Sequence, residues 1–300
     1  LTTSQVRSLG SVQVRALETQ QVEALTTEHV GVLTSVQTSA LTTTQVAAIE
    51  TQDIASLGTT QVRALGSAQV ASLTTDQVAA ISTTTLSSMA TASVRAITTD
   101  GIQALTTDQI VSLATSQVAS LSTRQLSAMA TDDLASLTTT QVQVLGTTQL
   151  RALSTEQLSV IATVQTSSLT TAQIAALGTA QVAALTTDNI ATFNSTQLRA
   201  FGSAQVAAFQ TEQIAAVTTD AIAGLSLIAL RGLTTDGVQA LSGAQLAALN
   251  TTLVANLSTV QVAAIATDDL PSLTTNQLRA FTVAQVRALG ADQIAALTTD

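Results

Sequence analysis

The sequence keeps an unbroken period of eight residues along its length, and such a period is the signature of a repeat architecture. When the chain is numbered in blocks of eight from Leu1, the first position of every block is Leu, Ile, Met, Phe or Val. No insertion or deletion interrupts this frame up to Leu297. We call each block an octad and its positions phases one to eight.

The other phases are almost as restricted as the first. Phase six is Val, Ile or Leu except at Thr38 and Thr166, where a Val stands two residues earlier (Val36 and Val164) and indicates local compensation. Phase three is nearly always Thr or Ser, phase five mostly Gln, and phase eight mostly Ala, Ser or Gly. The consensus is therefore L-T-T-x-Q-V-x-A, with phases four and seven free to vary.

This pattern predicts one short helix in each octad rather than a strand. Ala and Gln are poor strand formers, and phase six lies three residues before the next phase one, so both face the same side of a helix. Phase two is usually an N-cap residue, and T-x-x-Q from phase two to phase five forms a capping box. Most acidic residues stand at phase four and nine of ten Arg at phase seven, as the helix dipole favours. We expect a sharp turn at phases one and two.

A single octad cannot fold alone. Burying its two large apolar side chains gains roughly 3–6 kcal/mol, whereas ordering eight residues costs about 12 kcal/mol. Successive octads must therefore stack, which predicts an all-α solenoid: a superhelical rod with phases one and six inward and small phase-eight residues at close helix contacts. The number of octads per turn stays open; two would give a thin rod, and three or four a wider coil.

Two polar columns allow more than one interpretation. The Gln column could cap helices locally or form a stacked Gln ladder along the rod. The Thr columns could be caps or a regular hydroxyl array that binds ice or carbohydrate.

Little in the sequence points to catalysis or to cofactors. There is no Cys, no Trp, no Tyr and one His, and no nucleophile elbow, phosphate loop, dinucleotide fingerprint or zinc signature. His29 is interpreted as a hydrogen-bonding substitute for Gln at phase five. The pairs Asp132–Asp133 and Asp268–Asp269 are interpreted as first-turn acids, because adjacent helical residues point about 100° apart. We expect no catalytic, cofactor-binding or metal-binding residue, no cofactor and no enzyme activity.

Charge and hydropathy limit the partners. The formal net charge is −9 and all ten positive charges are Arg, which argues against nucleic-acid binding. No stretch has the length and hydropathy of a membrane span or a signal peptide. We expect one continuous array over residues 1–300, cut from a longer repetitive protein.

Two places depart from the repeat. The stretch AIAGLSLIALRG, residues 221–232, puts Leu227 and Ile228 at normally polar phases. It is either drift of the repeat or an exposed apolar patch for lateral contact. Pro271 at phase seven would lie late in a short helix, and we interpret it as drift.

The nonapeptide LTTDQVAAI from Leu73 to Ile81 resembles the octapeptide arrays of very large bacterial surface and secreted proteins, which are adhesin-like or filament-forming. The resemblance spans the whole chain. The same nonapeptide is similar to the first short helix of the repeats of TAL effectors, but those are longer, carry a second helix and a base-reading loop, and are basic.

The resemblance implies an extracellular or cell-surface structural protein that forms a rod or filament, either an adhesin stalk or a surface fibre. Its partner would be a further copy or the continuation of the same array. The alternative is a binding module that displays phases four and seven along the solenoid to carbohydrate, ice or protein. The sequence does not decide between stalk and filament, since the phase-four Val residues are too few for a seam: Val12, Val36, Val164 and Val260.

Overall fold

A computed structural model describes residues 1–297 and shows only helices in that range. Thirty-six α-helices and one 3-10 helix account for the 37 octads, so the predicted all-α repeat fold is confirmed. The chain divides into two compact units, Leu1–Leu153 and Ser154–Asp300, each described by itself. That the array is continuous over residues 1–300 stays a prediction.

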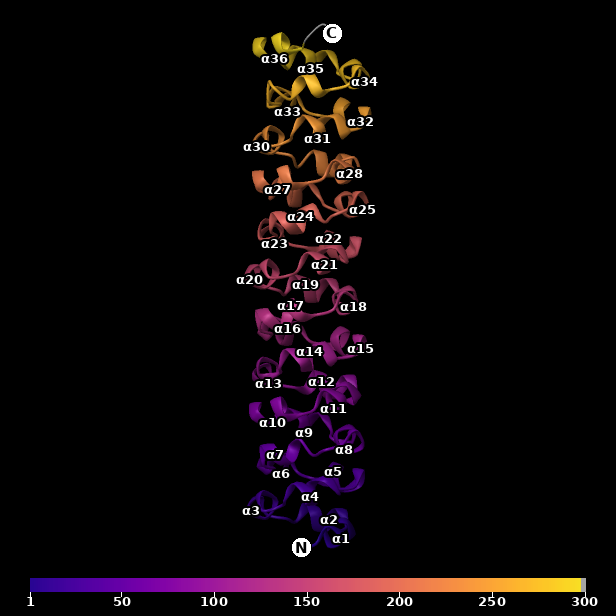
Figure 1. Ribbon diagram of the computed structural model, residues 1–300, viewed down its shortest axis with the longest axis vertical. Coiled ribbons are helices and arrows are strands. Elements are labelled where there is room, and N and C mark those ends of the chain that lie inside the picture. Colours follow the sequence, from indigo (N-terminus) through magenta and orange to yellow (C-terminus); the bar gives the residue numbers. More distant parts are fainter. Residues whose placement is uncertain (298–300) are drawn as a thin grey trace. The chain divides into compact units, whose positions relative to one another are not determined.

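The first unit contains nineteen helices, coloured indigo to magenta in Figure 1. They are α1 (Thr3–Ser8), α2 (Ser11–Arg15), α3 (Thr19–Glu23), α4 (Thr27–Gly31), α5 (Ser35–Ala40), α6 (Thr43–Ala48), α7 (Thr51–Ile54), α8 (Thr59–Ala64), α9 (Ser67–Ala71), α10 (Thr75–Ala80), α11 (Thr83–Ser88), α12 (Thr91–Ala96), α13 (Thr99–Ala104), α14 (Thr107–Ser112), α15 (Thr115–Ser120), α16 (Thr123–Ala128), α17 (Thr131–Ser136), α18 (Thr139–Gln143) and α19 (Thr147–Arg151).

The second unit contains the remaining helices. They are α20 (Thr155–Ser159), α21 (Thr163–Ser167), α22 (Thr171–Ala176), α23 (Thr179–Ala183), α24 (Thr187–Ala191), α25 (Ser195–Arg199), α26 (Ser203–Ala207), α27 (Thr211–Ala216), α28 (Thr219–Ile222), α29 (Leu227–Leu230), α30 (Thr235–Gln239), α31 (Gly243–Ala248), α32 (Thr251–Ala255), α33 (Thr259–Ala263), the 3-10 helix η1 (Leu270–Ser272), α34 (Thr275–Arg279), α35 (Val283–Ala288) and α36 (Ala291–Ala296).

Each α-helix begins where the sequence predicts, after an N-cap position at phase two. In α10 the hydroxyl of Thr74 accepts from the backbone N–H of Gln77 at 3.2 Å, and Gln77 Oε1 accepts from the N–H of Thr74 at 2.9 Å. Where phase two is Gly, as at Gly66, only the second of these bonds forms. The chain leaves the helix at phase one in an extended conformation, as at Ile81 with φ −64° and ψ 127°. This turn needs no left-handed residue, and no described residue has a positive φ.

The core of each unit consists of the phase-one and phase-six columns, as predicted. Val78 is fully buried and Ile81 is 3 % exposed. In the second unit, consecutive phase-one rings contact each other at steep angles: the ring centroids of Phe193 and Phe201 lie 5.4 Å apart in a T-shaped pair, and those of Phe201 and Phe209 lie 5.2 Å apart in a tilted pair. No described helix is long and apolar enough to cross a membrane.

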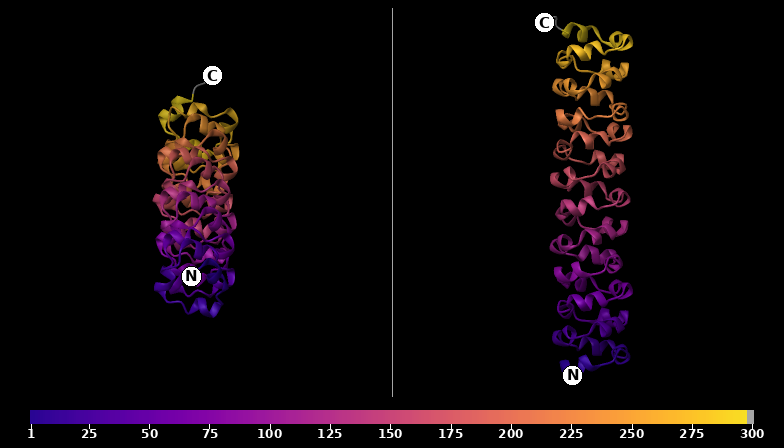
Figure 2. Two further views of the ribbon diagram at one scale, coloured as in Figure 1. Left: turned by 60° about the horizontal axis from the view of Figure 1, so that its bottom comes forward. Right: turned by 90° about the vertical axis from the view of Figure 1, so that its right-hand side faces the viewer.

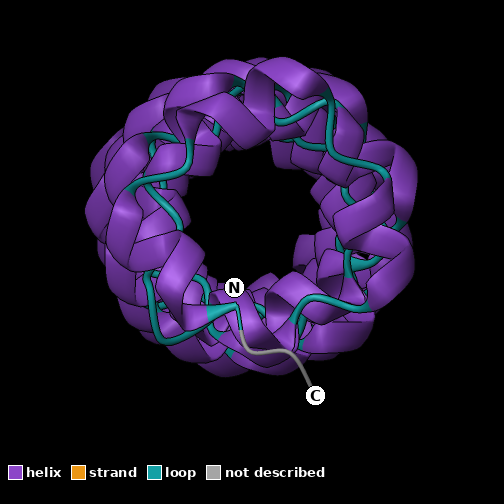
Figure 3. Cartoon of the chain, turned by 90° about the horizontal axis from the view of Figure 1, so that it is seen from above, coloured by secondary structure: helices purple, strands orange, loops and turns teal. Residues whose placement is uncertain are grey.

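Within each unit the octads wind around an axis, turn upon turn (Figure 2). Helices three octads apart pack against each other, such as α9 with α12 and α10 with α13. The phase-five side chain, however, reaches the end of the helix four octads back, as from α10 to α6. One turn therefore takes more than three and fewer than four octads. Figure 3 shows this winding from above. Within each unit, phases three and four are largely exposed, so the buried phase-one and phase-six columns lie on the inner side of the winding.

The expected compensation at the two phase-six Thr residues is wrong. Thr38 and Thr166 themselves fill the core at 1 % and 0 % exposure, whereas Val36 and Val164 are 64 % and 60 % exposed. The Thr38 hydroxyl donates to the carbonyl of Thr34 four residues earlier, at 3.0 Å, and Thr166 does the same to Ala162 at 3.2 Å. A satisfied hydroxyl can be buried at low cost, so no apolar replacement is needed.

The expected place of Pro271 late in a short α-helix is also wrong. Its octad forms a turn and the 3-10 helix η1 in place of an α-helix, because Pro lacks the N–H that an α-helix uses at this position. The change extends to the neighbouring turn: a Cβ on Gly243 would collide with the side chain of Ser272. Gly243, an exception at phase three, therefore belongs with Pro271.

Candidate interaction surface

The outer surface of the solenoid is made by the variable phases. Every described phase-four residue is exposed, and nearly every phase-seven residue is as well. These positions carry mostly Ala, Thr, Ser, Asp and Arg. Phase three, usually Thr, is largely exposed too and begins each helix. A partner that approaches the side of the winding would meet this surface, since the apolar columns are enclosed except in the first and last described octads, where Leu1, Val286 and Ile294 are exposed.

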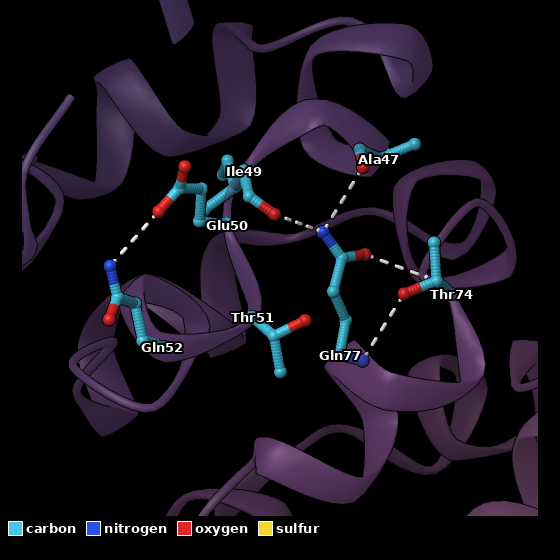
Figure 4. Close-up of a pocket in the computed structure, with 7 residues that line it drawn as sticks. All are labelled: Ala47, Ile49, Glu50, Thr51, Gln52, Thr74 and Gln77. Carbon is cyan, nitrogen blue, oxygen red and sulfur yellow. Dashed lines mark hydrogen bonds between the residues drawn. The ribbon is translucent and has the colours of Figure 1, made fainter. Parts of the chain in front are cut away.

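The Gln column joins successive turns. Gln77 Nε2 donates to the carbonyls of Val46 at 3.0 Å, Ala47 at 3.3 Å and Ile49 at 2.6 Å, while its Oε1 caps its own helix (Figure 4). Gln45, Gln109 and Gln141 do the same, always to residues 28, 30 and 31 positions earlier. These amides bond carbonyls, so the capping interpretation is confirmed and the Gln ladder is wrong.

The column satisfies groups that the short helices leave open. The last carbonyls of a helix have no partner within it. In the octads above, the Gln amide supplies that partner from the next turn while Oε1 satisfies an N-cap donor. No described buried side-chain polar atom is left without a partner. One Gln side chain thus satisfies an N–H at the start of its own helix and carbonyls at the end of a helix on the preceding turn.

Shallow grooves recur where the Gln column approaches the surface. The groove in Figure 4 has a volume of about 550 Å³ and is lined by Ile49, Glu50, Gln52, Thr74 and Gln77, among others. A second groove of about 450 Å³ lies 32 residues earlier, around the equivalent set: Leu17, Glu18, Gln20, Thr42 and Gln45. Glu50 accepts from Gln52 Nε2 at 2.9 Å. Each groove offers one carboxylate and several hydroxyl and amide groups.

His29 occupies the position of Gln and makes the same bonds, which confirms its interpretation. Nδ1 accepts from the N–H of Thr26 at 3.2 Å, so Nε2 carries the proton and donates to the carbonyl of Leu1 at 2.9 Å. Leu1 lies 28 residues earlier, as for the Gln amides. His29 is therefore part of the scaffold.

Asp at phase five behaves differently from Gln. Asp53 accepts from the hydroxyl of Thr27 at 2.6 Å, and Asp133 from that of Thr107 at 3.1 Å. Asp269 accepts from the N–H of Gly243 at 2.7 Å. In each case the donor lies 26 residues earlier, at phase three. Because the Asp side chain is shorter than Gln and only accepts, it bonds a phase-three donor on the preceding turn instead of the carbonyls that Gln reaches.

The paired acids do not form a two-carboxylate site. Asp132 is exposed and Asp133 is 5 % exposed, both in the first turn of α17, as predicted. Burial raises the pKa of Asp133; the hydrogen bond from Thr107 acts in the opposite direction, and the charge of Asp132 raises it further. Asp268 is exposed, but Asp269 stands at the N-cap position of η1 instead of in the first turn of an α-helix, and its side chain makes no capping bond. No group of three or more metal-ligating side chains occurs in residues 1–297.

The irregular stretch from Ala221 to Gly232 is a coordinated change. Ala221 and Ala229 replace Gln at phase five and are fully buried. A Cβ on Gly224 or Gly232 would overlap the carbonyl of the phase-three Ser three octads earlier, so Gly permits this close approach. The Ala and Gly substitutions thus occur together in two consecutive octads, Val217–Gly224 and Leu225–Gly232. Ile228 is 63 % exposed beside them.

The chain matches a known repeat family, and the matched motif fits the octad frame. The ALTTAQ repeat family matches residues 1–27, 46–83, 78–115, 126–163, 160–195, 190–227 and 262–299. Its six letters spell phase eight to phase five, the segment that holds the turn, the N-cap and the Gln. Together the matched stretches cover most of the chain. No curated protein matches the chain.

Proposed function

We propose, from the premise that this chain belongs to the ALTTAQ repeat family, that it is a structural protein whose octads form an extended rod or filament. The observation that carries the proposal is the Gln column. Wherever a Gln such as Gln77, Gln109 or Gln141 stands at phase five, its amide bonds its turn to the previous turn at the same spacing, so length can grow by adding octads without a new kind of contact.

The chemistry of the surface fits a spacer better than a catalyst. The charged residues lie mainly on exposed phases, and the described grooves are shallow and hold one carboxylate each. Nucleophilic catalysis requires a nucleophile with a base within hydrogen-bond reach. We therefore propose no enzymatic role.

We place this role outside the cell, as the stalk of an adhesin or as a surface fibre. The support is the resemblance of LTTDQVAAI to the repeats of large bacterial surface and secreted proteins. The absence of Cys is compatible with assembly in an oxidising compartment. Fractionation of the source cells tests this part: recovery in the cytosol alone contradicts it.

One observation favours a second function, a binding module. The groove of Figure 4 recurs 32 residues away with the same Glu at phase two, so a repetitive ligand could meet equivalent sites on successive turns. Glycan-array binding of the chain, compared with a Glu18→Gln/Glu50→Gln variant, tests it. Loss of binding in the variant supports a module; no binding by either protein contradicts it.

Small-angle X-ray scattering of the chain in about 0.5 M salt, where interactions between exposed charges are screened, tests the structural proposal. The rod predicts one cross-sectional radius along the particle and a length that scales with octad number, measured on the chain and on a version in which residues 57–112 are duplicated. A length that does not change with the added octads contradicts it.

A further inference from the structure

The exposed charges from Glu28 to Arg151, within the first unit, are segregated by winding. The arginine stripe comprises Arg63, Arg95, Arg124 and Arg151. The acidic stripe comprises Glu28, Glu50, Asp76, Asp100, Asp108 and Asp132. All ten side chains are exposed. The sequence mixes the two signs along the chain, so only the winding separates them.

The arginine stripe is continuous across turns. Ser93 of α12, the helix of Arg95, donates to the carbonyl of Leu65 at the end of α8, which carries Arg63, at 3.5 Å. Gln125 of α16 donates to the carbonyls of Val94 and Ile97 at the end of α12, at 3.0 and 2.9 Å. Helix α16 also packs against α19, which carries Arg151. Four Arg side chains therefore lie on successively neighbouring helices.

The acidic stripe is continuous in the same way. Helix α7 packs against α4 and α10, α10 against α13, and α14 against α17. Gln109 of α14 donates to the carbonyls of Val78 and Ile81 at the end of α10, at 3.1 and 2.6 Å. Each of these helices carries one exposed acid of the stripe.

The two stripes face different directions. Helix α12, with Arg95, is two octads from both α10, with Asp76, and α14, with Asp108. Because a turn takes fewer than four octads, two octads cover more than half of it and reach the far side of the winding. The stripes meet at two borders: α16 packs against α13, and Gln61 of α8 donates to the carbonyls of Val30 and Leu33 at the end of α4.

We propose that two copies of this chain associate side by side, with the arginine stripe of one copy against the acidic stripe of the other. Charge complementarity selects this partner, since one surface supplies guanidinium groups and the other carboxylates at the recurring intervals set by the same solenoid. This heterologous pairing leaves a free stripe on each copy, so it can continue into a sheet or bundle. It rests on the structural role proposed above and specifies how rods would assemble.

The salt dependence distinguishes this pairing from general charge effects. Copies with a net charge of −9 repel one another, and that repulsion is strongest at low salt. Attraction between the arginine stripe of one copy and the acidic stripe of another has the opposite salt dependence, because screening at high salt weakens that attraction. Association that strengthens as salt is removed therefore requires the stripes.

Sedimentation velocity of the chain at about 20 mM and about 0.5 M NaCl tests the proposal, since the Debye length falls severalfold between them. We expect dimers and larger species at low salt and monomers at high salt. The variant with Arg63→Gln, Arg95→Gln, Arg124→Gln and Arg151→Gln should weaken association at low salt by at least about tenfold.

The matched control lies in the second unit. The variant with Arg199→Gln, Arg231→Gln, Arg279→Gln and Arg287→Gln changes net charge equally but leaves the stripe intact, and it should associate like the original chain. A chain that stays monomeric at low salt, or two variants that weaken association equally, overturns the proposal. An extended monomer in X-ray scattering would then still support the rod.

Discussion

Replacement of one column Gln shows how much a turn depends on it. Gln77→Leu keeps nearly the same shape but removes the acceptor for the Thr74 N–H and the donor to the carbonyl of Ile49, whereas the Val46 carbonyl keeps its bond from the Ile49 N–H at 3.3 Å. Each buried group left without a partner costs about 1–3 kcal/mol, and the added apolar surface offsets part of the sum. We expect a local loss of about 2–4 kcal/mol.

Native-state amide exchange is the suitable assay, because repeat arrays open locally rather than all at once. A loss of that size speeds exchange in the peptides of α6, α7 and α10 by about 30- to 700-fold, at 1.4 kcal/mol for each factor of ten. Gln52→Leu is the control, since Gln52 is an exposed phase-four residue of the same turn. Equal exchange in the two variants would refute the reasoning.

Two further substitutions test the neighbouring features. Since burial raises the pKa of Asp133 above its ordinary value of 3.8, the folded state binds more protons between the ordinary and raised values, and stability falls as pH rises through that window. Asp133→Asn should therefore be more stable than the original chain at neutral pH, with the difference shrinking in acid; urea titrations at several pH values check this, with Asp132→Asn as a control expected to change little. Gly224→Ala places a Cβ on the carbonyl of Ser195 and should lower the thermal midpoint, at a cost of about 1–3 kcal/mol. Gly202→Ala, whose Cβ would lie 3.7 Å from a flexible side chain, should not; equal midpoints would contradict the close approach.

The local architecture was predictable from the sequence because it depends on local spacing. The capping box, the turn at phases one and two and the inward columns all follow from residues within one octad or its immediate neighbours. The winding does not, because the number of octads per turn depends on how side chains fit across turns. Gln77 shows this: its role as a cap was visible, whereas its bonds to residues 28 to 31 positions earlier were not.

Exceptions to the repeat were harder to interpret. Thr166 departs from Val and Asn189 from Gln, and the structure joins them through a bond from Asn189 Nδ2 to the Thr166 hydroxyl at 2.9 Å. The two positions are 23 residues apart, and nothing in the octad frame alone pairs them. The charge stripes were missed for the same reason, since they appear only when the winding is known.

The exchange rates of the Gln side-chain amide protons, measured by NMR, test the account most directly. Bonds from Nε2 to buried carbonyls predict strong protection for the column, including Gln77 and Gln109, and rapid exchange for the exposed Gln20 and Gln52. One rapidly exchanging population containing all of these side chains would contradict the claim that the Gln side chains at phase five bond their turns to the preceding ones.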